Sequence, residues 1–275
     1  MKLAIVGLGL IGASIARALA DKASVTGIDR DAATVEKALS EGVISRGGCD
    51  LSLAAGCDTA VIAVPVGSIV PVARELTAHL DPGTVLTDTG STKGEIVQAI
   101  DDLWPCFVGS HPIAGKENPG YGASQEDLFS DRVAILTPGS RTDSACIERV
   151  RALWEACGSR VVEMEPSLHD ELMAKISHIP HLLSFASMGF AHDLHIHRDL
   201  LGAGFRDFTR IAASDPVMWR DIFLANKGHI LKLIRDYIRE LETIAGMIGN
   251  DEARALEGLL RTYSSIRRDL YEHSR

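Results

Sequence analysis

The sequence predicts an α/β chain in which a doubly wound, mostly parallel sheet is followed by an all-helical part. Up to about residue 165, short apolar runs alternate with helical patterns such as "VGSIVPVARELTAHL". This alternation is typical of a parallel sheet covered by helices on both faces. After Pro166 the strand signals stop and only helical patterns continue. We therefore expect two domains, residues 1–165 and residues 166–275.

The expected strands are short runs rich in Val, Ile and Leu, with turn residues or helical patterns between them. In chain order they are Leu3–Val6, Val25–Ile28, Ala60–Val64, Val85–Thr87, Cys106–Gly109, Val133–Leu136 and Arg160–Glu163. In sheets of this kind the ligand lies over the carboxyl ends of the strands. Candidate functional side chains are therefore sought where the strands end.

The helical part contains three expected helices. Ser167 and Asp170 form a capping pattern that opens a helix to about residue 195. Asp215 followed by Pro216 opens a long amphipathic run to about residue 248, and Asp251 caps the last helix. Helices this long, with apolar stripes, pack either in a bundle within the chain or against a second copy. We predict a homodimer through this domain, with the intrachain bundle as the alternative.

Composition and charge exclude several classes of partner. The chain has 275 residues, of which 46% are hydrophobic and 24% charged, and a formal net charge of -9. This balance is typical of a globular protein and disfavours a nucleic-acid partner, so an anionic substrate must be held by a few local cations. No apolar run reaches the roughly 18 residues of a spanning helix. The N-terminal apolar run is interrupted by glycines and lacks a cleavage-site pattern. We expect a cytoplasmic protein with no membrane partner.

Neither the cysteines nor the histidines predict a metal site. The five cysteines form no paired motif, and they are Cys49, Cys57, Cys106, Cys146 and Cys157. Such a scattered, odd set is expected to stay as reduced thiols. The histidines of "HDLHIH" (192–197) have no supporting acidic or cysteine cluster. We therefore expect no bound metal.

The segment "LAIVGLGLIGASI" has the pattern of a phosphate-binding loop between a strand and a helix. Its glycines permit a tight turn, close approach of a pyrophosphate and close packing of the helix on the strand. An ordinary βα turn is the alternative, but the strand–turn–helix setting favours a Rossmann-type dinucleotide domain. The expected cofactor contacts in this loop are Gly7, Leu8, Gly9, Leu10, Ile11 and Gly12.

The choice of dinucleotide depends on the end of the second strand. Asp29 lies 22 residues after Gly7, where a carboxylate would bond the ribose hydroxyls of NAD and repel the extra phosphate of NADP. Arg30 could instead hold that phosphate, so NADP stays possible. Val64 and Pro65, at the end of the third expected strand, complete the predicted cofactor-binding set.

Ser91 lies in "VLTDTGSTKGEI", which ends the fourth expected strand. Thr92 and Glu95 have the spacing of a capping box, which would leave the Ser91 hydroxyl available to a ligand. The alternative is that Ser91 itself caps the following helix.

His111 follows the next strand, in "GSHPIAGKENPG". Pro112 restricts His111 to an extended backbone, and Gly115, Gly120 and Gly122 suit close approach of a ligand. Imidazole is well suited to take a proton from a hydroxyl group near neutral pH. A buried structural histidine is the alternative, and we predict a catalytic base.

Taken together, the motifs resemble those of the prephenate/arogenate dehydrogenase family. The resemblance covers nearly the whole chain, and in order its motifs are "GLGLIG", "TDTGSTK", "GSHPIAG", "ISHIPH" and "GFRDFTRIAASDP" followed by "MW". It implies an NAD(P)-binding domain followed by a helical dimerisation domain. It also implies a substrate that is a cyclohexadienol with a ring carboxylate and a side-chain carboxylate.

The resemblance also assigns residues to the substrate site. It implies that His178 and Arg210 bind substrate, with Arg206 as a weaker candidate and Glu117 near the pocket mouth. His181 is expected to have a packing or surface role. Arg206 and Arg210 are four residues apart, and like charges so placed are unfavourable unless an anion lies between them. A structural pair between Asp207 and Arg210 is the alternative.

The implied reaction is an oxidative decarboxylation within tyrosine biosynthesis. His111 would take the hydroxyl proton while a hydride passes from the same carbon to NAD⁺, and Ser91 would hydrogen-bond both that oxygen and His111. Loss of CO₂ makes the ring aromatic. The favoured substrate is prephenate, which gives 4-hydroxyphenylpyruvate, and arogenate, which gives tyrosine, is the alternative. Two less favoured functions are those of a reductase of similar two-part build and of a non-catalytic dinucleotide sensor.

Overall fold

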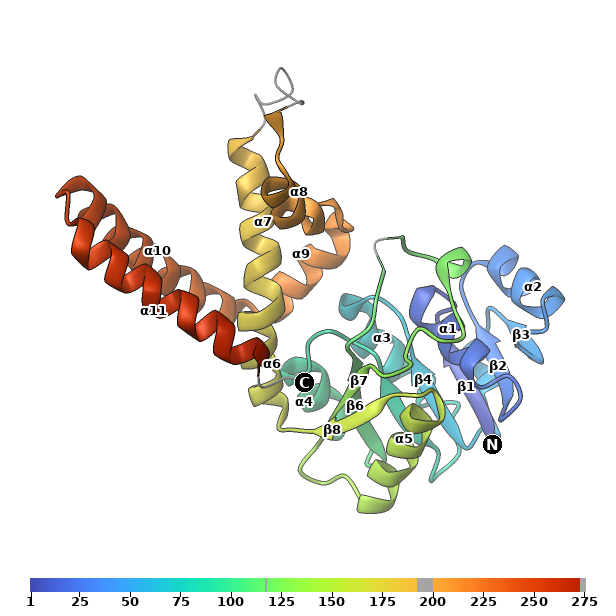
Figure 1. Ribbon diagram of the computed structural model, residues 1–275. Coiled ribbons are helices and arrows are strands. Elements are labelled where there is room, and N and C mark those ends of the chain that lie inside the picture. Colours follow the sequence, from blue (N-terminus) through green and yellow to red (C-terminus); the bar gives the residue numbers. More distant parts are fainter. Residues whose placement is uncertain (117, 192–199, 273–275) are drawn as a thin grey trace. The chain divides into compact units, whose positions relative to one another are not determined.

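The computed structural model describes residues 1–116, 118–191 and 200–272 (Figure 1). Within these residues an eight-stranded sheet has the order β3-β2-β1-β4-β5-β6-β7-β8. The strands are β1 (Lys2–Val6), β2 (Ser24–Ile28), β3 (Arg46–Gly48), β4 (Thr59–Ile62), β5 (Val85–Asp88), β6 (Phe107–Pro112), β7 (Val133–Pro138) and β8 (Arg160–Glu163). The predicted class, a doubly wound and mostly parallel sheet followed by helices, is confirmed.

Two features of the sheet differ from the predicted strands. The edge strand β3 was not predicted, because its sequence, Arg46-Gly47-Gly48, has no apolar side chain. Strand β7 runs antiparallel to β6, with His111 opposite Ile135, whereas the other neighbouring strands are parallel. The antiparallel partner covers β6 along its length, including the histidine near its end.

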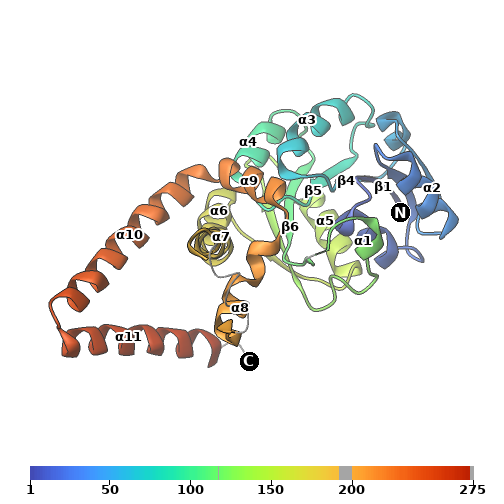
Figure 2. The same cartoon turned by 90° about the horizontal axis from the view of Figure 1, so that it is seen from above.

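Helices cover both faces of the sheet. Those flanking the strands are α1 (Leu10–Ala18), α2 (Ala32–Ser40), α3 (Val66–Leu76), α4 (Gly94–Asp101) and α5 (Ser144–Ala156). Apolar residues of α1, α2 and α5 form one buried cluster, and those of α3 and α4 form a second. Figure 2 shows α3 and α4 on one side of the sheet and α5 on the other. Burial of both sheet faces accounts for the continuous apolar strands.

After β8 the chain forms one nearly continuous helical run. It consists of α6 (Pro166–Met173), a π-helical turn η3 (Ala174–His178) and α7 (Ile179–Phe190). The π-turn ends two residues before Pro180, which lacks a backbone N–H and is tolerated in the first turn of α7. Next to α7 lie α8 (Ala203–Thr209), the short helix η5 (Arg210–Ala213) and α9 (Pro216–Ala225). The Ser184 hydroxyl on α7 donates to the Phe208 carbonyl on α8, at 3.0 Å.

Some predicted helix boundaries are wrong. Asp170 does not cap its own helix with Ser167, because its carboxylate bonds α4 instead. Helix α7 ends at Phe190 rather than near residue 195, and residues 192–199 lie outside the described chain. Asp215 does cap α9, accepting from the Met218 N–H at 2.8 Å. The predicted long run after it is interrupted at Asn226.

The described chain divides into two compact units, Met1–Lys227 and Gly228–Arg275. The second unit is a helical hairpin made from α10 (Lys227–Gly249) and α11 (Ala253–Glu272), with the Tyr263 hydroxyl bonded to Glu240 across it. Asp251 lies in the connecting turn with φ of 56°. Large apolar side chains of the hairpin are exposed, among them Leu231, Ile238, Leu241, Leu260, Ile266 and Leu270.

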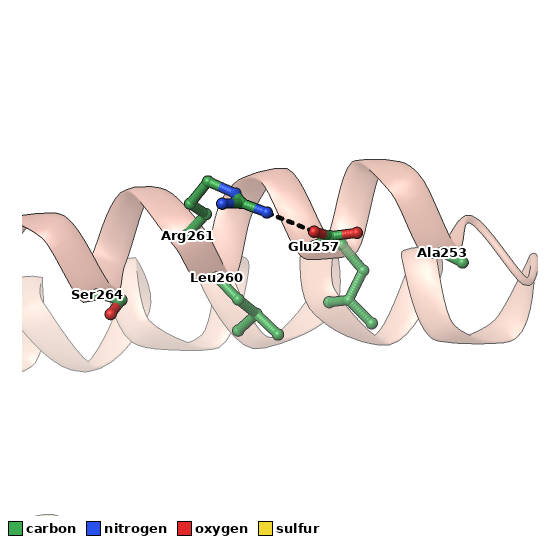
Figure 3. A pocket seen from close by; sticks show the side chains of 6 residues that line it. Ala253, Glu257, Leu260, Arg261 and Ser264 are labelled. Atoms are coloured by element: carbon green, nitrogen blue, oxygen red, sulfur yellow. Dashed lines mark hydrogen bonds and ion pairs between the residues drawn. The ribbon is translucent and has the colours of Figure 1, made fainter.

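A shallow hollow on α11 belongs to this hairpin. It is lined by Ala253, Leu256, Glu257, Leu260, Arg261 and Ser264. Figure 3 shows Arg261 and Glu257 paired along the helix, 2.6 Å apart, beside Leu260. Among the described residues, no helix is long and apolar enough to cross a membrane.

The prediction that all cysteines are reduced thiols is wrong for one pair. Cys106, which precedes β6, and Cys146 on α5 form a disulfide with their Cα atoms 5.7 Å apart. These positions are 40 residues apart in sequence, so no sequence motif marks them as a pair. The free cysteines of the described chain are Cys49, Cys57 and Cys157.

Candidate active site

The glycine loop after β1 has the open geometry that a pyrophosphate requires. Gly7 has φ of +95°, and a Cβ atom there would lie 2.4 Å from the Ala63 carbonyl oxygen. A Cβ atom on Gly12 would lie 1.9 Å from the Gly7 carbonyl oxygen. By contrast, no atom lies within 4 Å of a Cβ built on Gly9, which precedes α1. This open space at a helix N-terminus fits a phosphate group held by backbone N–H groups.

Asp29 follows β2 and closes the other side of this loop. Its carboxylate accepts hydrogen bonds from the backbone N–H groups of Leu8, at 2.7 Å, and Asp31, at 2.9 Å. Each carboxylate oxygen has a further lone pair, so ribose hydroxyls can still donate to it. Arg30 beside it is exposed. The residues present therefore fit a dinucleotide.

The remaining predicted cofactor residues lie at the same edge of the sheet. Leu10 and Ile11 form the first turn of α1, and Val64 and Pro65 connect β4 to α3. Strands β1 and β4 are parallel neighbours. Their carboxyl ends therefore bring the two turns side by side.

His111 lies near the end of β6 and is held by a chain of side chains. Its Nδ1 atom is 2.9 Å from Nε2 of His169 on α6, and Nδ1 of His169 is 2.8 Å from Oδ1 of Asp170. The two imidazole rings meet edge to face, with centroids 5.1 Å apart. The predicted hydrogen bond between Ser91 and His111 is not formed in this structure, and the His111 ring bonds His169 instead.

Asp170 joins this chain to the start of α4. Its Oδ1 atom also accepts from the Lys93 backbone N–H at 2.7 Å, and its Oδ2 atom accepts from the Gly94 N–H at 2.8 Å. Burial acts to raise the pKa of Asp170, but hydrogen bonds from His169, Gly94 and Lys93 outweigh burial and hold it below its ordinary value. The carboxylate is therefore ionised and complements the positive end of α4.

A fully buried ion pair lies behind His111. The side chains of Lys93 and Asp88 are both 0% exposed and are hydrogen-bonded to each other. Lys93 Nζ also donates to the Ser110 carbonyl at 2.9 Å, and Asp88 Oδ1 accepts from the Ser110 N–H at 3.1 Å. Burial lowers the pKa of Lys93, against the opposing charges of Asp88 and Asp170. The pair ties the end of β5 to β6, one residue before His111.

The histidines of this network are held in their neutral form. Burial lowers the pKa of His111 well below 6.5, and the neighbouring His169, Lys93 and His178 add to the effect. Burial also lowers the pKa of His169, although its hydrogen bond to Asp170 opposes the shift. Near neutral pH, His111 is therefore an uncharged imidazole that can accept a proton.

Ser91 is supported from behind by His178. The His178 side chain is buried, with 1% of the residue exposed, and its Nδ1 atom is 3.1 Å from the Asn226 side-chain nitrogen. Burial lowers the pKa of His178 to about 4, although Asp170 and the Ser91 backbone oppose the shift. The structure thus places His178 against the Ser91 loop, and its substrate contact stays a prediction. The predicted Thr92 capping box is also absent, since Thr92 Oγ1 is buried without a hydrogen-bond partner.

His181 has the more open position on the helical side. Its ring stacks on Trp219 with centroids 3.7 Å apart, and its Nδ1 atom is 2.9 Å from the Ser177 carbonyl oxygen. Burial lowers the pKa of His181, and the charge of the nearby Arg210 adds to this effect. The Trp219 indole nitrogen is buried without a hydrogen-bond partner. A cation, an imidazole and an aromatic ring therefore come together here, and the stack on Trp219 is a packing contact of the kind expected for His181.

The structure shows less about the remaining predicted site residues. Arg206 is exposed on α8, four residues before Arg210. Glu117 lies outside the described residues, as do the histidines of 192–197. Within the described chain, no group of three or more His, Cys, Asp or Glu side chains could hold a metal ion.

The sequence analysis missed the residues that support His111 and His178. These are Asp88, Lys93, His169, Asp170 and Asn226. Lys93 offered a signal, because it ends the motif "TDTGSTK", one of those that carry the family resemblance. The adjacent His169 and Asp170 offered none, since such a pair is ordinary on a solvated helix.

Family comparisons agree with this geometry. The model of the prephenate dehydrogenase nucleotide-binding domain matches residues 13–163, and that of the prephenate dehydrogenase dimerization domain matches residues 165–262. The chain belongs to the prephenate dehydrogenase family. Its members are oxidoreductases of tyrosine biosynthesis, as the motif resemblance implied.

Individual relatives include both substrate types. Prephenate dehydrogenase of Bacillus subtilis is 37% identical over 277 residues, which cover 95% of this chain and 74% of that protein. Prephenate dehydrogenase of A. aeolicus, solved with hydroxyphenyl propionate and NAD⁺, has a TM-score of 0.90 at 33% identity and covers 98% of both chains. Synechocystis arogenate dehydrogenase has a TM-score of 0.87 at 31% identity, with 98% of this chain and 100% of that chain covered.

Proposed function

We propose that the chain catalyses the NAD-dependent oxidative decarboxylation of prephenate to 4-hydroxyphenylpyruvate. The observation that carries this proposal is a neutral His111 at the carboxyl edge of the sheet that also bears the dinucleotide-fitting glycine loop. The similarity to the prephenate dehydrogenases of Bacillus subtilis and A. aeolicus supports the choice of substrate.

In the proposed reaction His111 acts as the base. When bound, NAD⁺ supplies the acceptor for the hydride that leaves the hydroxyl-bearing ring carbon. His111 takes the hydroxyl proton, and Ser91 hydrogen-bonds the same oxygen to fix its direction. The bond to the ring carboxylate then breaks, CO₂ leaves, and its electron pair makes the ring aromatic. The product oxygen takes the proton back, so atoms and charge balance.

Arg210 is the proposed partner of a substrate carboxylate. Arginine binds carboxylates through two parallel hydrogen bonds. His181 and Trp219 lie beside it and would add an imidazole and an indole N–H to the same region. Arg206 and Glu117 are proposed as further substrate-binding residues. His178, which lies against the Ser91 backbone, is proposed as part of the same substrate site.

The cofactor and the assembly are part of the proposal. Asp29 favours NAD over NADP, because a carboxylate repels a 2′-phosphate. A homodimer through the helical domain is proposed because the α10–α11 hairpin exposes large apolar side chains and the matching family model is a dimerization domain.

Arogenate is the second candidate substrate, because Synechocystis arogenate dehydrogenase has nearly the same fold and coverage. The test is steady-state kinetics of the purified protein with prephenate and with arogenate, each with NAD⁺ and with NADP⁺, following the reduced cofactor. We expect the highest kcat/KM with prephenate and NAD⁺. A higher value with arogenate would reassign the substrate, and no turnover in any combination would overturn the proposal.

A further inference from the structure

His169 and Asp170 form a buried connection to His111 and take no direct part in the proposed reaction. His169 is 0% exposed and contacts His111 on one side and Asp170 on the other. Asp170 is in turn fixed by the backbone N–H groups of Lys93 and Gly94. The Asn226 side chain donates to the Asp170 carbonyl at 2.8 Å and so holds this part of α6 from a second direction.

The direction of each hydrogen bond in this connection follows from Asp170. An ionised carboxylate can only accept hydrogen bonds, so Nδ1 of His169 must carry a proton. A neutral imidazole has one donor and one acceptor, which leaves Nε2 of His169 as the acceptor. Nδ1 of His111, 2.9 Å away, must then be the donor. The remaining nitrogen of His111, Nε2, is left with a free lone pair.

We propose that His169 and Asp170 are positioning residues that fix the tautomer of His111, so that its Nε2 atom is the base. This inference rests on the proposed function, because it assigns the atom of His111 that takes the substrate proton. Without His169, Nδ1 of His111 loses its acceptor. The ring is then able to carry its proton on Nε2, where it cannot take another from a hydroxyl.

The surroundings of His111 favour this arrangement over a charged pair of histidines. The charged or titratable groups that act on the ring are His169 from α6, Lys93 from the start of α4 and His178 from η3, and Asp88 at the end of β5 pairs with Lys93. Lys93 is a buried cation, and its charge is already paired with Asp88. A second positive charge on either imidazole is unfavourable in this buried setting. The stable arrangement is therefore one in which both imidazole rings are neutral and share a single hydrogen bond.

The tautomer can be measured without substrate. Nitrogen NMR of the full chain labelled with ¹⁵N-histidine distinguishes a protonated from an unprotonated ring nitrogen, and His111→Asn identifies the His111 signals. We expect Nδ1 of His111 to be protonated and Nε2 to be unprotonated at neutral pH. The opposite tautomer in the wild-type chain would overturn the inference, whatever the substrate proves to be.

Kinetics of two His169 variants test the consequence for catalysis. His169→Gln supplies an amide oxygen that can accept from His111 Nδ1, whereas His169→Leu cannot accept, and neither change removes the Asp170 cap of α4. We expect His169→Leu to lower kcat roughly 100-fold with little change in KM, and His169→Gln to retain kcat within about tenfold. The control is His79→Gln, outside this network, with kcat unchanged.

Two outcomes separate this inference from a purely structural role of His169 and from failure of the proposed function. Equal losses in His169→Leu and His169→Gln, with the His111 tautomer unaltered in both, would mean that His169 only packs. An NMR result as expected in a protein that turns over no cyclohexadienyl acid would leave the tautomer assignment standing and remove the proposed function. Thermal unfolding of both variants identifies any loss of kcat that comes from unfolding.

Discussion

The two sides of the candidate site differ in how deeply their charged groups are buried. On the sheet side, Lys93, Asp88 and Asp170 are buried and bonded to one another's backbone or side chains. On the helical side, Arg210 is exposed and the Trp219 indole N–H is buried without a partner. The buried charges of the sheet side are therefore fixed by bonds within the chain, whereas the charge of Arg210 is accessible to a substrate.

This difference separates two kinds of contribution to a reaction. A base must have a fixed direction and protonation state, and buried, fully bonded neighbours provide both. A group that binds a substrate carboxylate exchanges its hydrogen bonds with water for bonds to the ligand, so it must be accessible to solvent. Substitutions on the sheet side should consequently change kcat or stability, and those on the helical side should change KM.

The largest expected effect is that of His111→Asn. Removing the base should lower kcat by about 10³–10⁴-fold, at the upper end of general-base effects, with KM little changed. Steady-state kinetics with prephenate and NAD⁺ measure this directly. Unchanged kcat would remove His111 from the role of base and with it the distinction between the two sides.

The next effect concerns the buried pair on the sheet side. Lys93→Met leaves the Asp88 carboxylate buried without its cation, which should lower the free energy of unfolding by about 3–5 kcal/mol. Lys175→Met is the matched control, because Lys175 pairs with Glu171 at 2.6 Å on an exposed surface, where such pairs contribute about 0–1 kcal/mol. Urea unfolding measures the loss of unfolding free energy in each variant. Similar losses would show that burial does not increase the contribution of the Lys93–Asp88 pair to stability.

The pH dependence of stability probes the support behind Ser91. The unfolded chain protonates His178 below about pH 6.5, but burial lowers the pKa in the folded chain to about 4. Stability should therefore fall as the pH falls from about 6.5 to about 4, by roughly 3 kcal/mol from this residue alone. Urea unfolding across that range should show a shallower decline in His178→Gln, and an unchanged decline would contradict the assignment.

The smallest effect is expected on the helical side. Arg210→Gln should raise KM for prephenate by about 10–100-fold, corresponding to loss of a charged hydrogen bond, while kcat changes less. Arg149→Gln, at an exposed position on α5, is the matched control and should leave KM unchanged. If Arg210→Gln lowers kcat and spares KM, Arg210 does not bind a substrate carboxylate.

Local patterns in the sequence were enough to predict the class of the sheet, the glycine loop and the strand end that carries His111. Alternating apolar runs, glycines at fixed spacing, and a histidine before a proline each act within a few residues. The edge strand β3 was missed for the same reason, because Arg46-Gly47-Gly48 pairs with β2 through backbone groups alone.

Packing in three dimensions determined which side chains support the site. Asp170 has the sequence context of a cap for its own helix, yet it caps α4, 76 residues away. His178 and His181 belong to one short motif, and only the fold places one of them against Asn226 while the other stacks on Trp219. Such contacts join segments that are distant in sequence, so local sequence patterns do not predict them. The physical reason is that a buried polar group loses its hydrogen bonds to water. It must then be bonded by a group that the fold places beside it, however distant that group is in sequence.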